Sequence, residues 1–197
     1  TTLFRSDIIR QYKAKGVNVT SEVTVHHLTL TDEACATYNS ATRVSPPLRS
    51  WDHVQAMREA VLDGTVDAIV TDHAPHAPEE KDVEFRYAPC GFCGLETSLG
   101  VMLTDLYHTN IFDLKTIISK MSCEPSKLFK LERGTLAEGA VADITIMDLN
   151  KEWTVDSSKF YTRGKFTPYE GKECKGKAVA TMLAGKFVMR DGVVCAK

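Results

Sequence analysis

The run VTDHAPH at residues 70–76 carries the clearest chemical signal in the sequence, because it places one carboxylate and two imidazoles close together. It includes the end of Val66–Val70, a short apolar run typical of a buried strand. An aspartate at a strand end can bind a divalent metal ion through one oxygen and take a proton from metal-bound water with the other. His76, on the following loop, could turn back to bind an anionic group. The same pattern also fits a loop-capping Asp72 beside ordinary surface histidines.

Two residue pairs elsewhere are further candidates for chemistry. His26 and His27 are adjacent at the end of a β-type run, where they are candidate zinc ligands. Cys90 and Cys93 have the spacing of a redox-active pair or of half a zinc site. The other four cysteines supply no second pair at that spacing, so a four-thiolate zinc site is not predicted.

The elements that must position these residues alternate between helix and strand. Apolar residues at helical spacing predict helices, and β-branched runs predict strands. In chain order we expect a helix at Ser6–Lys15, a strand at Val17–Val25, a helix at Ser50–Asp63, a strand at Val66–Val70, and helices at Leu95–Tyr107, Leu114–Met121 and Pro125–Leu131. This alternation is typical of parallel α/β architecture, in which catalytic groups lie at the C-terminal ends of the strands.

The pattern becomes β-rich after Leu131. Ala142–Asp148 is an apolar β-type run, and two more such runs between Lys177 and Val194 surround a turn at residues 184–186. Asp191-Gly192 is a strong hairpin dipeptide. We therefore expect a small β layer in this part of the chain.

Composition excludes several classes of function. The 197 residues are 43% hydrophobic and 25% charged, with a formal net charge of −2. This balance predicts no basic face for nucleic acid, and no apolar run approaches the roughly 20 residues of a membrane helix. The N-terminus is too polar for a signal peptide, so a cytoplasmic protein with reduced cysteines is expected.

Residues 71–76 resemble the last-strand signature of the dihydroorotases (type I), within the amidohydrolase superfamily. Four further runs agree with that family in order and spacing. They are EVTVHHL at 22–28, with Val25 in place of the usual proline, GFCGLET at 91–97, the stretch 134–144, and TPYEG at 167–171. Together the five runs cover nearly the whole chain from about Ile8 onward.

The resemblance implies an α/β fold in which residues 1–132 are the C-terminal part of a (β/α)8 TIM-type barrel and residues 133–197 a small β-sandwich layer. The barrel in this chain would be incomplete, because two strands cannot close one. The family's remaining metal ligands, including a His-x-His on the first strand, are not identifiable here. We therefore expect a fragment that self-associates through uncovered surfaces or is partly disordered around residues 72–91.

The resemblance also assigns site residues. Asp72 corresponds to the family's metal ligand and general acid/base, and His76 to the histidine that binds the substrate carboxylate. The backbone of Cys90 and Gly91 corresponds to a loop that hydrogen-bonds the substrate ring. Ser45 stands where relatives place a longer asparagine that reaches the substrate. One or two zinc ions per complete site are implied, and they can be absent from this fragment.

The implied activity is the reversible cyclisation of N-carbamoyl-L-aspartate to (S)-dihydroorotate in pyrimidine biosynthesis, by an enzyme expected to be a homo-oligomer. An allantoinase or hydantoinase, or a non-catalytic scaffold relative, is the alternative. His76 favours an anionic substrate. The family gives the His26-His27 pair no ligand role, which leaves it to orient loops. It places other residues at the positions of Cys90 and Cys93, so a thiol redox protein is the weakest alternative.

Overall fold

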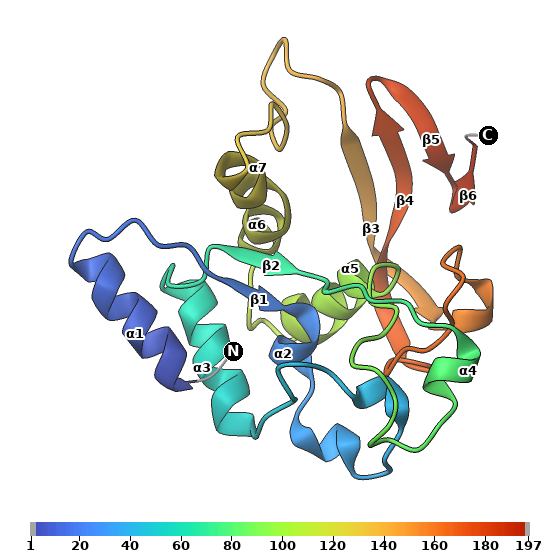
Figure 1. The fold of residues 1–197 in the computed structure, drawn as a ribbon. Helices are drawn as coiled ribbons and strands as arrows, with labels where there is room; N and C mark the ends of the chain where they lie inside the picture. Colours follow the sequence, from blue (N-terminus) through green and yellow to red (C-terminus); the bar gives the residue numbers. More distant parts are fainter. Residues whose placement is uncertain (1–2, 196–197) are drawn as a thin grey trace.

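The computed structural model describes residues 3–195, which form two sheets with helices around and between them (Figure 1). The first sheet is a parallel pair, β1 (Glu22–Thr24) and β2 (Ala68–Val70). The second is antiparallel, in the order β3 (Ile144–Thr154), β4 (Glu173–Leu183), β5 (Lys186–Arg190) and β6 (Val193–Val194). A parallel pair followed by an antiparallel sheet confirms the predicted change of character along the chain.

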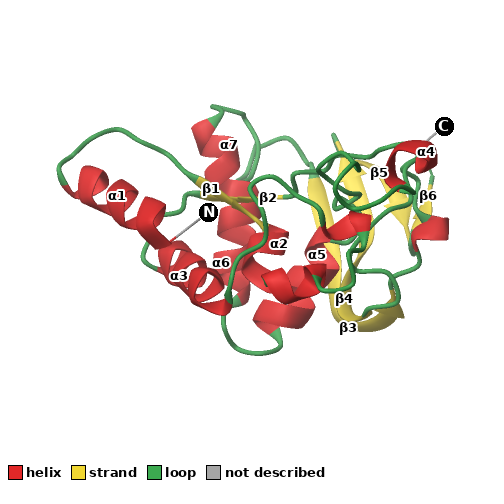
Figure 2. Cartoon of the chain, turned by 60° about the horizontal axis from the view of Figure 1, so that its bottom comes forward, coloured by secondary structure: helices red, strands yellow, loops and turns green. Residues whose placement is uncertain are grey.

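The helices gather around the parallel pair. Helices α1 (Leu3–Ala14) and α3 (Trp51–Leu62) lie side by side on one side of it (Figures 1 and 2). The remaining helical segments are α2 (Val25–Thr29), α4 (Pro78–Lys81), α5 (Ser98–Met102), the π turn η3 (Leu103–Tyr107), α6 (Leu114–Ile118), the π turn η4 (Ser119–Cys123), α7 (Glu124–Leu128), and 3-10 turns at Asp32–Cys35, Ser40–Thr42 and Ser157–Lys159. None of the helices in the described range is long and apolar enough to cross a membrane.

The predicted strand at residues 17–25 is wrong in extent. Only Glu22–Thr24 forms a strand, and the chain turns into α2 directly afterwards. The cause is local, because the Thr24 hydroxyl accepts a hydrogen bond from the backbone N–H of His27 and so caps α2. The short strand nevertheless carries the chain toward the same end of the sheet as β2.

The predicted break between two helices before Pro125 is also absent. Helical conformation runs from Leu114 to Leu128, and the π turn η4 lies immediately before the α7 segment that holds Pro125. Proline has no N–H to donate to the preceding turn, and a wider π turn is one way in which a helix accommodates a local irregularity.

Both predicted hairpin turns of the second sheet are confirmed. Ala184 and Gly185 have φ values of 46° and 79°, and Asp191 and Gly192 have values of 53° and 80°. Two consecutive residues with positive φ define the two-residue turn whose twist matches that of the flanking strands. These turns therefore fix the β4–β5 and β5–β6 pairings.

The two sheets are joined through α5, which packs against β4. A Cβ atom at Gly100 would lie 2.5 Å from the Trp153 ring, and one at Gly176 would lie 2.6 Å from Leu103. Only glycine allows so close an approach at these two points. The main hydrophobic core is continuous across this contact, from Val23 of β1 to Cys174 of β4.

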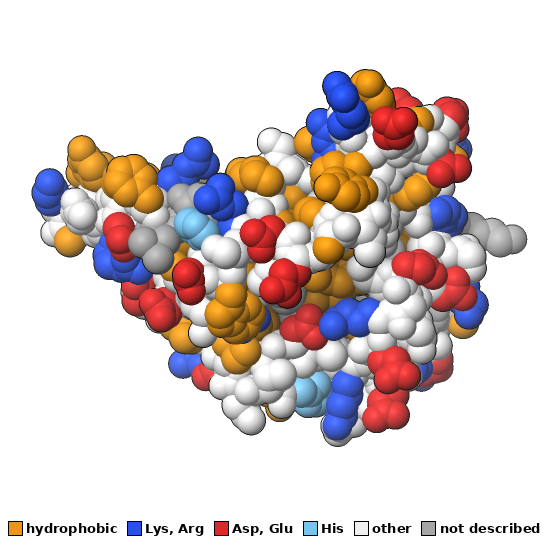
Figure 3. Space-filling model, turned by 90° about the horizontal axis from the view of Figure 1, so that it is seen from below, with side chains coloured by type: hydrophobic (Ala, Val, Ile, Leu, Met, Phe, Trp, Pro, Cys, Tyr) orange, Lys and Arg blue, Asp and Glu red, His pale blue; other side chains and the backbone are white. Residues whose placement is uncertain are grey.

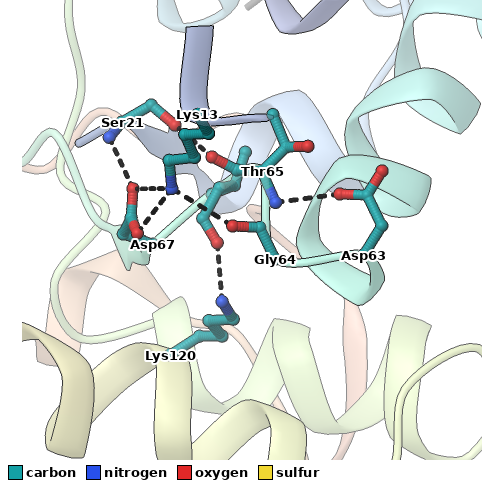
Figure 4. A network of polar contacts seen from close by, with 8 residues as sticks. Lys13, Ser21, Asp63, Gly64, Thr65, Asp67 and Lys120 are labelled. Carbon is teal, nitrogen blue, oxygen red and sulfur yellow. Dashed lines mark hydrogen bonds and ion pairs between the residues drawn. The ribbon is translucent and has the colours of Figure 1, made fainter. Parts of the chain in front are cut away.

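A polar network closes the N-terminal ends of β1 and β2 (Figure 4). Lys13 of α1 places its ammonium 2.7 Å from both carboxylate oxygens of Asp67. The same carboxylate accepts the backbone N–H of Ser21 at 2.8 Å, and Lys120 donates to the carbonyl of Val66 at 2.6 Å. These contacts tie helices to strands at the end of the sheet opposite Asp72.

One helix face remains apolar and open to solvent. Phe4, Ile8 and Tyr12 follow one another at four-residue spacing on α1, and all three are exposed. Figure 3 shows hydrophobic side chains gathered on the projecting arm that α1 forms. Such a stripe is typical of a helix face that packs against another element.

Candidate active site

Asp72 lies two residues beyond the end of β2, with its side chain exposed. Its backbone has a φ of 49°, in the left-handed region that aspartate adopts more readily than most residues. Backbone conformations of this kind concentrate at functional sites. The placement of Asp72 at the C-terminal end of a parallel strand agrees with the prediction from the sequence.

The residues after Asp72 pair with the loop at 90–95. His73 and Phe92 form a parallel bridge, and the N–H of Ala74 donates to the carbonyl of Phe92 at 3.0 Å. The Nδ1 atom of His73 accepts the N–H of Leu95 at 3.2 Å. These contacts pin the two loops together beside the strand end, and they give His73 a structural partner.

His76 reaches the same loop through its ring. Its Nε2 lies 3.1 Å from the carbonyl oxygen of Cys90, so Nε2 carries the proton and donates. Its Nδ1 lies 3.5 Å from a carboxylate oxygen of Glu80. The structure thus brings His76 and the Cys90 backbone together.

Gly91 occupies the closest approach between the two loops. Its φ is 116°, and a Cβ atom there would lie 2.5 Å from the Cβ of Ala74 and 3.5 Å from Nε2 of His76. Its N–H donates to the carbonyl of Arg43 at 2.8 Å. A side chain at this position would therefore push the loop away from His76.

Ser45 lies in the neighbouring segment, two residues after Arg43, and is exposed. The carbonyl oxygen of the next residue, Pro46, lies 3.0 Å from Nε2 of His27. Ser45 is thus held between an anchor on the Gly91 loop and an anchor on α2. The backbone of this segment therefore lies beside the Gly91 loop, through the bond from Gly91 to Arg43 rather than through the Ser45 side chain.

The adjacent histidines differ in their contacts: both ring nitrogens of His27 have hydrogen-bond partners, whereas those of His26 are buried and have none among the described residues. His27 is neutral because burial lowers its pKa, and it donates from Nε2 to Pro46 while Nδ1 accepts the Thr24 hydroxyl at 2.6 Å. His26 is 1% exposed and packs against the rings of His27 and Phe92. Burial, with a smaller contribution from His27, lowers the pKa of His26 to about 3. Both ring nitrogens of His27 are therefore occupied by loop-orienting contacts.

Residues 3–195 do not hold a zinc site by themselves. Within that range no group of three or more His, Cys, Asp or Glu side chains is placed to bind one metal ion. A catalytic zinc needs about three protein ligands. Asp72 supplies a single carboxylate at the strand end, so the donor set of this chain does not fit the metal without further ligands.

The cysteine pair does not have the features of a redox site. Cys90 is exposed and Cys93 is buried, and both are free thiols. Burial raises the pKa of the Cys93 thiol, so Cys93 itself is not a reactive thiolate. The N–H of Cys93 donates to the carbonyl of Phe166 at 2.8 Å, which is a packing role.

A segment between β3 and β4 closes over the loop from the other side. The Glu96 carboxylate accepts the backbone N–H groups of Tyr161 and Thr162, each at 3.0 Å, and the Thr162 hydroxyl at 2.9 Å. A Cβ atom at Gly164 would lie 2.9 Å from the Cys93 sulfur and 3.1 Å from the His76 carbonyl. Glu96 therefore links the candidate site to the second sheet.

Two basic residues near the site carry no signal in the sequence pattern. Lys81 is completely buried, and Arg43 donates to three backbone carbonyls of the loop before Pro89. Lys81 follows two glutamates and precedes an aspartate, which is the composition of a solvated surface. Nothing in its local spacing distinguishes it from an exposed lysine.

The fold and this strand-end site define a class of protein. The chain belongs to the amidohydrolase family, whose model matches residues 3–188. It is 48% identical over 184 residues to a dihydroorotase of Syntrophus aciditrophicus (strain SB), and 49% identical over 183 residues to a dihydroorotase of Pelobacter propionicus (strain DSM 2379 / NBRC 103807 / OttBd1). Each match covers 93% of this chain and 43% of the relative, so the chain spans under half the length of these curated relatives.

Solved structures give the same fold. The L-hydantoinase (dihydropyrimidinase) from Arthrobacter aurescens superposes with a TM-score of 0.93 at 31% identity, over 98% of this chain and 44% of that one. A D-hydantoinase superposes with a TM-score of 0.90 at 22% identity, which supports the fold alone. The amidohydrolase fold predicted from the sequence is therefore confirmed.

Proposed function

We propose that this chain is the C-terminal half of a dihydroorotase, which interconverts N-carbamoyl-L-aspartate and (S)-dihydroorotate in pyrimidine biosynthesis. The observation that carries the proposal is the arrangement at the end of β2. There Asp72 is exposed beside a loop pair in which His76 bonds the Cys90 carbonyl. Relatives that are 42–49% identical to the chain and bear the name dihydroorotase support this choice of substrate.

Each site residue has a role in the proposal. In the hydrolytic direction water attacks the ring carbonyl, Asp72 takes a proton from it, and the same proton is passed to the leaving amide nitrogen. Cyclisation is the reverse of these steps. His76 binds the substrate carboxylate, and the Cys90–Gly91 backbone hydrogen-bonds the ring. Ser45 lies at the edge of the same site, where its hydroxyl has a shorter reach than an amide.

The remaining parts of the proposal concern the whole protein. Residues 1–132 would form the last part of a (β/α)8 barrel, and residues 133–197 a β-sandwich layer. Asp72 would be one ligand of one or two zinc ions, with the other ligands coming from outside this chain, since residues 3–195 hold no sufficient set. We infer a cytoplasmic homo-oligomer with a small-molecule substrate.

Hydantoinase activity is the second candidate, supported by the TM-score of 0.93 to an L-hydantoinase. The two candidates differ in the charge of the substrate. Dihydroorotate carries a carboxylate, for which His76 is a suitable partner, whereas a hydantoin ring need not carry one. A non-catalytic scaffold is a third candidate, and it has no chemical need for Asp72 or His76.

The proposal is tested by measuring zinc content and dihydroorotate hydrolysis in this chain and in the chain extended by its preceding segment. We expect activity only in the extended protein, and Asp72→Asn should reduce kcat by about 10²–10⁴-fold. Asp191→Asn is the matched control, because Asp191 is exposed and left-handed at a φ of 53° in a hairpin of the second sheet. Hydrolysis of hydantoins without hydrolysis of dihydroorotate would refute the proposal, and full activity of Asp72→Asn would refute the role of Asp72.

A further inference from the structure

Lys81, the last residue of α4, is the largest completely buried side chain in the described part of the chain. Its ammonium donates to the carbonyl oxygen of Ser40 at 2.7 Å and to that of Pro89 at 2.9 Å. The Ser40 hydroxyl in turn donates to the carbonyl of Lys81 at 2.6 Å. Lys81 therefore joins the segment at residue 40 to the residue that immediately precedes Cys90.

A buried ammonium is costly unless hydrogen bonds replace its lost water. Burial lowers the pKa of Lys81; among the smaller effects, Cys90 raises it and Arg43 lowers it. The two acceptors of the ammonium are neutral backbone carbonyls, so these bonds form only while the two loops keep their positions relative to each other. A lysine in such a place fixes backbone positions, which a surface lysine does not do.

Arg43 continues the same junction. The two N–H groups of its Nη1 are shared among the carbonyl oxygens of Phe85, at 3.0 Å, Arg86, at 2.6 Å, and Ala88, while its own carbonyl accepts the N–H of Gly91 at 2.8 Å. The segment from residue 40 to 43 thus holds the loop from 81 to 91 along its whole length. Lys81 supplies the contact adjacent to the Cys90–Gly91 peptide.

We propose that Lys81 is a positioning residue, which holds the Cys90–Gly91 backbone beside the end of β2 so that it can bind the substrate ring. The inference rests on the proposed function, because it assigns a purpose to the loop that the proposed enzyme uses. Lys81 itself does not touch the substrate in this proposal. Its effect on the reaction passes through the Pro89 carbonyl and the peptide that follows it.

The first test uses hydrogen exchange of the Gly91 amide in this chain. We expect Lys81→Met to speed that exchange by about 10- to 100-fold, because the variant leaves two carbonyls without their charged donor. Lys120→Met is the matched control. It removes a lysine-to-carbonyl bond of 2.6 Å at the opposite end of β2, so exchange at Gly91 should not change. Unchanged exchange in Lys81→Met would overturn the proposal that Lys81 positions the Cys90–Gly91 backbone.

The second test separates positioning from general stability in the extended, zinc-loaded enzyme. We expect Lys81→Met to raise the KM for dihydroorotate by about 5-fold or more while kcat falls less than 2-fold, since ring binding is weakened and the proton transfer is not. Lys81→Arg, which keeps a charged donor, should restore part of the loss. Equal falls in kcat for the lysine variants at 81 and 120, with no change in KM, would overturn the positioning role.

The two tests also distinguish the failure of this inference from that of the proposed function. A wild-type enzyme without dihydroorotase activity would refute the function, and the exchange measurement would still decide whether Lys81 holds the loop. If Lys81→Met does not fold, Ser40→Ala removes the hydroxyl bond to the Lys81 carbonyl and leaves the ammonium in place. Faster Gly91 exchange in Ser40→Ala is then the expected result, and unchanged exchange would refute the inference.

Discussion

Replacing Gly91 by alanine should destabilise the protein and separate the two loops of the candidate site. The backbone of Gly91 has a φ of 116°, well beyond the left-handed region that residues with a side chain occasionally adopt. An alanine methyl group would also lie 2.5 Å from the Cβ of Ala74 and 3.3 Å from its carbonyl oxygen. Both atoms belong to Ala74, in the loop that starts at Asp72, so the strain acts directly on the site.

The magnitude follows from these two effects. A strained backbone conformation costs about 1–3 kcal/mol, and a forced contact in a packed region costs about another 1–3 kcal/mol. The sum of about 2–6 kcal/mol is a large part of the 5–15 kcal/mol that typically separates folded from unfolded states. Part of the strain can be relieved if the loop moves away from His76, which would lengthen the bond from His76 to the Cys90 carbonyl.

Urea unfolding of Gly91→Ala and Gly64→Ala measures the effect. Gly64 is the matched control, because its φ is 83° but a Cβ atom there would have no neighbour within 4 Å. We expect Gly64→Ala to cost about 1–2 kcal/mol and Gly91→Ala at least 1 kcal/mol more. Equal losses in the two variants would refute the reasoning, because they would show that contact with Ala74 contributes nothing.

Three further perturbations have defined outcomes. Lys13→Met should lower the free energy of unfolding by about 1–2 kcal/mol in urea titrations, because its partner Asp67 is only partly exposed. The folded pKa of His26, about 3, lies below its unfolded value of 6.5. The contribution of His26 to the free energy of unfolding is therefore complete above pH 6.5 and falls by up to about 1.4 kcal/mol per pH unit as the pH drops toward 3. His26→Phe should flatten this slope when the free energy of unfolding is measured across the same pH range. Glu96→Gln should make cleavage by trypsin at Arg163 about 10-fold faster, because a neutral amide holds the 161–162 segment less strongly than the carboxylate does, and an unchanged cleavage rate would contradict this role.

The sequence predicts those elements whose cause lies within a few residues. The helices near Ser6–Lys15 and Ser50–Asp63, and both hairpins of the second sheet, follow from apolar spacing or from turn dipeptides. The strand at 17–25 was predicted too long because a single hydroxyl, that of Thr24, converts the next residues into a helix. The spacing of apolar residues carries no information about a single capping hydrogen bond.

The residues of the candidate site also differ in whether the sequence could reveal them. Asp72 and His76 could be found from the sequence because both lie in one short run after an apolar strand. Lys81 could not be found, because its burial depends on two carbonyls supplied by residues 41 positions before it and 8 positions after it. A charged residue between Glu80 and Asp82 has every local feature of a surface position.

Most of the contacts that shape this site have a backbone group as at least one partner. His76 bonds the carbonyl of Cys90, the N–H of Cys93 bonds the carbonyl of Phe166, and Lys81 bonds carbonyls alone. Such contacts place no demand on the side chain at position 90, where the exposed thiol makes no contribution to the His76 bond. They place a strict demand at Gly91, where a single methyl group would meet the opposite loop. The geometry therefore constrains the residue types at Gly91 and Lys81. Neither constraint requires cysteines at positions 90 and 93.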